Sequence, residues 1–182
     1  MSKIAGIGFL LFLTANIALA DEPSPYAGQQ AREIKALSPQ EVQDYLEGKG
    51  MGFAKAAELN RFPGPLHVLG LADKLRLTRE QKARTEQIRA AMQREAKALG
   101  RTLVEKEREL DRSFSSGDID AAKLRSLIAE IGRLQAEVRN AHLQAHLEQR
   151  AVLTPAQIAA YDEFRGYAPG NASAHPRDSH GR

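Results

Sequence analysis

Residues 77–118 read LTREQKARTEQIRAAMQREAKALGRTLVEKERELDRSFSSGD, and this stretch decides the fold. Thr78 and Gln81 form a capping box, which marks the start of a helix. From there to about residue 115 the chain contains one glycine, Gly100, and no proline. Apolar residues recur at helical spacing: Ile88, Met92, Ala96, Leu99, Leu103, Leu110 and Phe114. The pattern predicts one long amphipathic helix.

A second long helix follows a short turn at 115–118, where Asp118 is the predicted N-cap. It covers residues 119–152, and its apolar stripe is Leu124, Leu127, Ile128, Ile131, Leu134, Val138, Ala141 and Ala145. Two long amphipathic helices joined by a tight turn form an antiparallel hairpin.

Shorter helices are predicted on both sides of this hairpin. Capping boxes begin at Ser38 and Thr154, and no segment shows the sustained alternation of a β-strand. The short helices are predicted at residues 26–37, 39–47, 53–60, 66–75 and 155–164. The sequence therefore predicts an all-α fold, a long antiparallel helical hairpin with short flanking N- and C-terminal helices.

The N-terminus has the pattern of a signal peptide. Lys3 precedes an apolar run at residues 4–17, and Ala18-Leu19-Ala20 forms a small-x-small cleavage signature. The run is shorter than the roughly 20 apolar residues that a membrane-spanning helix needs. We therefore predict export, with residues 1–20 removed after Ala20.

The rest of the chain is long enough for one ordinary domain. Short helices occupy 21–65, and the hairpin domain occupies 66–167. The polar, proline- and glycine-containing tail at 168–182 is predicted to be disordered.

Composition excludes several classes of function. The chain has no cysteine, which removes disulfides and every thiolate role. Its 26 basic and 23 acidic side chains alternate along the helices, unlike the clustered basic face of a nucleic-acid binder. No Ser/His/Asp set and no tuned carboxylate pair is evident, so we predict a protein that is not an enzyme.

His142 and His146 are the strongest candidates for a binding site. Histidines at i and i+4 lie on one helix face and can hold one metal ion. Leu143 stands where a zinc protease has its catalytic glutamate, so such an ion would not be hydrolytic. If the hairpin turns at residue 117, Met92 and Ile88 lie opposite the pair. The alternative is two partly buried histidines with structural hydrogen bonds.

Further ligands would come from the N-terminal helices packed on the hairpin. His67 is the first candidate, followed by Glu58 and Met51, and the candidate ions are those of Zn, Ni, Co and Cu. Each residue also has a plain structural interpretation. His67 could pack beside the Pro-Gly-Pro turn, Glu58 could be a surface carboxylate, and Met51 could be an apolar anchor.

Residues 77–81 (LTREQ) and 153–157 (LTPAQ) share the pattern L-T-x-x-Q. With a signal peptide ahead of them, they resemble the Spy/CpxP family of bacterial periplasmic proteins over about residues 66–165. The block at 50–60, GMGFAKAAELN, is similar to the N-terminal part of a metal-sensor-like subgroup. This chain departs from the family by lacking a His- or Cys-rich metal tract near its mature N-terminus, and its charge is nearly balanced.

The resemblance implies a periplasmic hairpin, often a homodimer, involved in envelope stress or heavy-metal response. Members variously bind metal, inhibit a sensor kinase in the membrane, or hold unfolded clients. We expect metal binding through the histidine pair, in a sensor or resistance factor that binds no nucleic acid. The alternative is an ATP-independent chaperone that holds unfolded client proteins on a face with Val104, Leu143 and Leu147, unless these residues pack against the terminal helices or a second subunit.

Overall fold

A computed structural model describes residues 23–168, which contain no β-strand. The helical elements are η1 (Gln29–Ala31), α1 (Pro39–Glu47), α2 (Lys55–Glu58), α3 (Pro65–Gly70), α4 (Arg79–Ser116), α5 (Ala121–Val152) and α6 (Pro155–Phe164). The prediction of an all-α hairpin with short flanking helices is confirmed. None of the helices described is both long and apolar enough to span a membrane. The predicted signal peptide and residues 169–182 of the predicted tail lie outside the described residues.

The chain divides into two units, residues 1–30 and 31–182. The described part of the first unit consists of turns, with the amide of Ala27 donating to the carbonyl of Ser24 at 2.8 Å. The helix predicted at 26–37 is therefore wrong, since only a short 3-10 turn forms there. Gly28 has a φ of 86°, a left-handed conformation that interrupts a right-handed helix.

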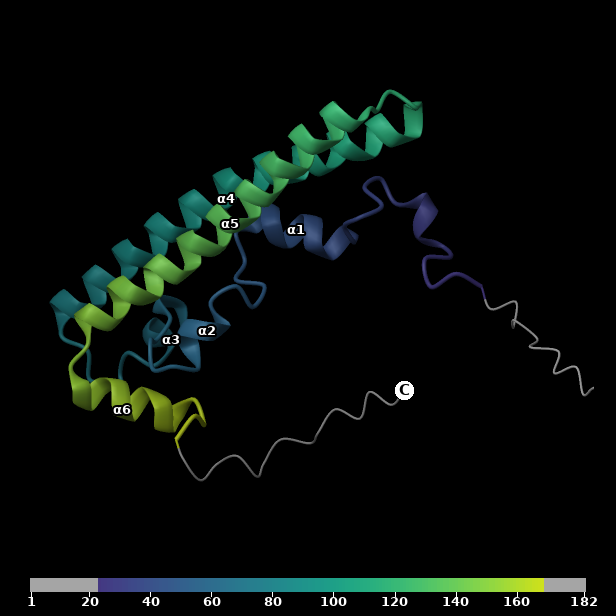
Figure 1. The fold of residues 1–182 in the computed structure, drawn as a ribbon. Coiled ribbons are helices and arrows are strands. Elements are labelled where there is room, and N and C mark those ends of the chain that lie inside the picture. Colours follow the sequence, from purple (N-terminus) through teal and green to yellow (C-terminus); the bar gives the residue numbers. More distant parts are fainter. Residues whose placement is uncertain (1–22, 169–182) are drawn as a thin grey trace, which may run out of the picture. The chain divides into compact units, whose positions relative to one another are not determined.

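The second unit is built on the hairpin of α4 and α5, which lie side by side (Figure 1). Gly117 ends α4 in the left-handed conformation at a φ of 73°. The N-cap of α5 is Asp120 and not Asp118 as predicted. The Asp120 carboxylate accepts hydrogen bonds from the amides of Ala122 and Lys123 at 2.9 and 2.8 Å. Asp118 instead forms an ion pair with Lys123 at 2.9 Å.

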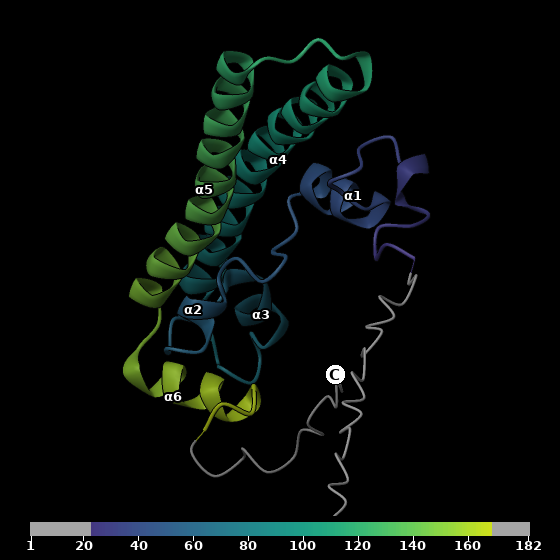
Figure 2. The ribbon, with the colours of Figure 1, turned by 45° about the vertical axis from the view of Figure 1, so that its right-hand side comes forward.

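Helix α1 packs against α4 (Figure 2). The contact is so close at Gly100 that a Cβ atom there would lie 2.2 Å from the carbonyl oxygen of Tyr45. This explains a glycine in the interior of a long helix, where glycine otherwise costs about 1 kcal/mol relative to alanine.

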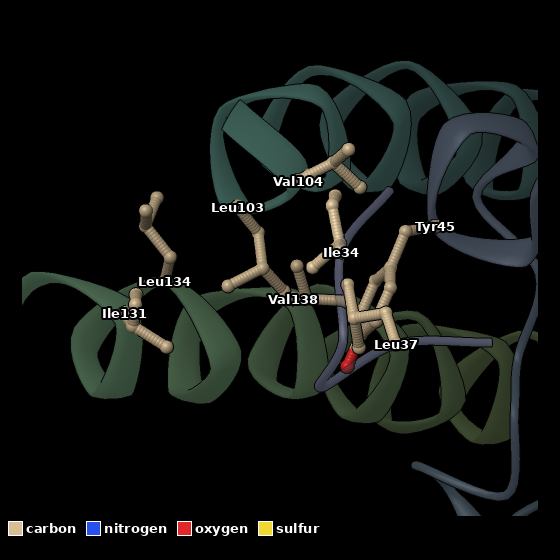
Figure 3. Packing of buried hydrophobic residues seen from close by; sticks show 8 residues of the cluster. All are labelled: Ile34, Leu37, Tyr45, Leu103, Val104, Ile131, Leu134 and Val138. Carbon is tan, nitrogen blue, oxygen red and sulfur yellow. The ribbon is translucent and has the colours of Figure 1, made fainter. Parts of the chain in front are cut away.

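A central cluster is formed by buried side chains of α1, of the segment before α1, and of α4 and α5 (Figure 3). Its members are Ile34, Leu37, Tyr45, Leu103, Val104, Ile131, Leu134 and Val138. Val104 is only 1% exposed, and it belongs to the same cluster as Ile34, Leu37 and Tyr45. The sequence left open whether Val104 lies on an exposed face or packs against the short helices. For Val104, packing is confirmed, because the residue is buried.

The open end of the hairpin holds a second cluster, made of Val68, Leu75, Leu153, Ile158 and Tyr161. Helices α2 and α3 are shorter than predicted because turns replace their ends. Arg61 and Arg76 adopt positive φ values of 65° and 50° in these turns. In α3, Val68 is fully buried, whereas Leu66 is 54% exposed.

The two L-T-x-x-Q segments meet at this open end. Each glutamine carbonyl caps its own helix by accepting from the backbone amide of Thr78 or Thr154, at 3.0 and 2.9 Å. The side-chain amides of Gln81 and Gln157 also donate to each other's oxygens, at 2.9 and 3.0 Å. The repeated motif therefore joins the start of α4 to the start of α6.

Candidate metal centre

A hollow of about 720 Å³ lies near the open end, among α3, α4, α5 and the connection after α1. His142 and His146 of α5 both line it, because residues four apart share one helix face. His67 of α3 and Met92 of α4 line the same hollow. Three of the five predicted site residues therefore line one hollow, and Met92, which the hairpin register predicts opposite His142, lines it too.

A backbone hydrogen bond orients the ring of His146. Its Nδ1 lies 2.7 Å from the carbonyl oxygen of Phe62, which can only accept. Nδ1 therefore carries the proton, and in the neutral ring Nε2 keeps its lone pair. Gly64 packs closely against the same ring, where a Cβ would lie 2.9 Å from Cε1 and 3.0 Å from Nε2. Metal-binding histidines commonly donate their second nitrogen to a carbonyl in this way.

His142 is 4% exposed, and its Nε2 has no hydrogen-bond partner among the described residues. Its ring lies 5.8 Å from the ring of Phe53, tilted by 33°. Burial lowers the pKa of His142, and the nearby His146 lowers it further. The imidazole is therefore neutral at pH 7, and a neutral imidazole is the form that binds a metal ion.

His67 lines the hollow from a more exposed position. Partial desolvation lowers the pKa of its imidazole, and the charge of Arg165 adds to this effect. His67 is thus also neutral at pH 7.

Glu58 lies beside the histidines but is committed to other groups. One of its oxygens accepts from the Tyr161 hydroxyl at 2.5 Å, the Tyr167 hydroxyl at 3.2 Å and Arg165 at 3.3 Å. The other accepts from the amide of Gly64 at 3.2 Å and lies 3.8 Å from Nδ1 of His146. Through these contacts Glu58 fixes the turn that contains Gly64, and this turn orients His146.

Met51 packs against the central cluster, as Phe53 does. It is not among the residues that line the hollow. Within residues 23–168, no group of three histidine or carboxylate side chains is close enough to hold an ion.

Two contacts that orient His146 could not be predicted from the sequence. The carbonyl of Phe62 and the close approach of Gly64 orient His146, and both belong to the turn at 61–65. The Pro63-Gly64-Pro65 segment signals a tight turn, but no pattern in it identifies the helix on which it packs.

The profile of the LTXXQ motif family matches residues 67–165, just over half of the chain. The chain belongs to the LTXXQ motif family. At family level it is a periplasmic protein of the stress or metal-resistance type, and the family is a non-enzymatic one. The expected resemblance to the Spy/CpxP type is confirmed. Neither the curated proteins nor the solved structures contain a match to the chain.

Proposed function

We propose that this LTXXQ protein binds a transition metal ion in the hollow, through His142 and His146 with His67 beside them. The observation that carries the proposal is the buried Nε2 of His142, which has no partner among the described residues and belongs to a side chain that lines the hollow. A buried polar atom without a partner costs about 1–3 kcal/mol. A metal ion coordinated by this ring would offset that cost.

The surroundings of His146 support the same proposal. Its Nδ1 is engaged by the Phe62 carbonyl, so a metal would meet Nε2 of a ring whose tautomer and direction are already set. Because α5 supplies the pair and α3 supplies His67, a bound ion would join the hairpin to the short helices. The protein would act by binding, and ligation would stabilise this end of the fold, by about 2.7 kcal/mol at a hundredfold excess of free metal over Kd.

The test is isothermal titration of residues 21–182 with Zn²⁺, Ni²⁺, Co²⁺ and copper. The His142→Ala/His146→Ala variant should lose stoichiometric binding. A matched control, His175→Ala/His180→Ala, removes two histidines outside the described residues and should retain binding. Binding that survives in the His142/His146 variant would contradict the proposal.

A second candidate function is the holding of unfolded clients. Leu66, Leu147 and Phe164 are 54%, 52% and 47% exposed, which supplies apolar surface to such a function. Suppression of aggregation of a denatured client by the metal-free protein, weakened in a Leu66→Ser/Phe164→Ser variant, would favour it. Absence of suppression at a twofold excess of protein would reject it.

A further inference from the structure

The hollow offers a metal ion soft and neutral ligands. His67, His142 and His146 contribute imidazoles, and Met92 contributes a thioether from α4. The nearest carboxylate to the pair, Glu58, is already occupied by two hydroxyls, an arginine and a backbone amide. Protein zinc sites use three or four nitrogen, oxygen or thiolate ligands, and residues 23–168 contain no group of three histidine or carboxylate side chains close enough to hold an ion. Imidazole suits copper as well as zinc and nickel, and a thioether is a soft ligand of the kind that suits Cu⁺.

The charge of the side chains around the hollow also favours a monovalent ion over a divalent one. Lys49, Arg89 and Lys97 line it, and Glu47 is the acidic residue among the lining side chains. Glu47 is itself paired with Lys49 at 3.0 Å. The cationic side chains therefore outnumber the acidic one, and their repulsion of a bound cation doubles when the ion carries two charges instead of one.

From this ligand set and charge we infer that the hollow selects Cu⁺, with Met92 as a ligand alongside His142 and His146. This inference rests on the proposed metal-binding function and specifies its ion. His142 is 4% exposed, so its ring is shielded from most of the water that a hard divalent ion retains. Met92 therefore has a role beyond filling space between the helices.

The test replaces the thioether with hydrocarbon of similar volume in Met92→Leu. Affinity for Cu⁺ is measured by competition with bicinchoninic acid under ascorbate, and affinity for Zn²⁺ by calorimetry. We expect Met92→Leu to weaken Cu⁺ binding at least tenfold and to leave the weaker Zn²⁺ binding unchanged. Met51→Leu is the matched control, because Met51 packs in the central cluster and should leave Cu⁺ binding at its original strength.

X-ray absorption of the Cu⁺-loaded wild-type chain tests the ligand directly and does not depend on a variant that folds. Copper–sulfur scattering that is present in the wild type and absent in Met92→Leu supports the inference. Copper–nitrogen scattering alone, or Zn²⁺ bound more tightly than Cu⁺, overturns it while the proposed function stands. Metal binding that persists in His142→Ala/His146→Ala overturns the proposed function and this inference together.

Discussion

The middle of the hairpin and its open end bury side chains of different character. In the middle, the central cluster packs aliphatic side chains around Tyr45, and Glu107 is the charged side chain buried beside it. At the open end, polar side chains are buried beside the apolar cluster. Among residues 23–168, the three buried side-chain atoms without a hydrogen-bond partner all lie toward this end: His142 Nε2, Gln149 Oε1 and Asp162 Oδ1.

Polar contacts join the elements of the open end. Gln149 donates to Thr85 at 3.2 Å, and Thr85 donates to the carbonyl of Gln81 at 2.8 Å. Arg61 forms an ion pair with Asp162 at 2.8 Å. Such contacts stabilise a fold less per group than apolar burial does, because they replace hydrogen bonds to water. The middle of the hairpin therefore supplies more of the stability, while the open end contains the buried polar groups at which we propose metal binding.

The largest expected effect is in the middle. Leu103 is fully buried, so Leu103→Ala should lower the free energy of unfolding by about 2–5 kcal/mol through lost burial and a cavity. Urea denaturation measures the loss, and metal affinity under native conditions should stay unchanged. A loss below about 1 kcal/mol would contradict the claim that the central cluster is the main source of stability.

The contact of α1 with α4 gives the next effect. Gly100→Ala would place a Cβ against the Tyr45 carbonyl and should cost about 1–3 kcal/mol as α1 shifts. Gly132→Ala is the matched control on α5, where a Cβ meets nothing within 4 Å. That control should gain about 0.5–1 kcal/mol from helix propensity. Thermal denaturation should therefore move the two melting temperatures in opposite directions, and equal shifts would contradict the described contact.

The paired glutamines test how strongly the start of α4 and the start of α6 are coupled at the open end. Gln81→Ala and Gln157→Ala should each destabilise the protein, and the double variant should lose less than the sum of the two. We expect a coupling of about 1 kcal/mol in a double-mutant cycle measured by urea denaturation. Additive losses would mean that each glutamine only caps its own helix.

The smallest effect on stability is expected at His142, although its effect on binding is large. His142→Leu removes a buried nitrogen without a partner, so the free energy of unfolding should stay the same or rise by up to about 1 kcal/mol. Metal binding, followed by calorimetry, should be lost. If His142 has a structural role instead, His142→Leu should lower the free energy of unfolding. A loss above about 2 kcal/mol would identify His142 as a structural residue.

Local signals in the sequence determined the two long helices and the starts of the helices that begin with a capping box. Capping boxes at Ser38, Thr78 and Thr154 start helices where predicted, and Gly48 and Gly117 end them, because these interactions lie within a few residues of chain. The hairpin itself follows from two apolar stripes and a turn. The i, i+4 spacing of His142 and His146 likewise placed both on one face.

Only the tertiary structure decided which groups meet across the chain. The hydrogen bonds of Glu58 with Tyr161 and Arg165, and that of the Phe62 carbonyl with His146, join residues far apart in the sequence. The packing of Met51 against the central cluster is likewise a contact that no local pattern predicts. The burial of Val104 depends on its packing in the same cluster. Contacts between residues far apart in sequence arise from packing, so spacing and helix propensity do not determine them.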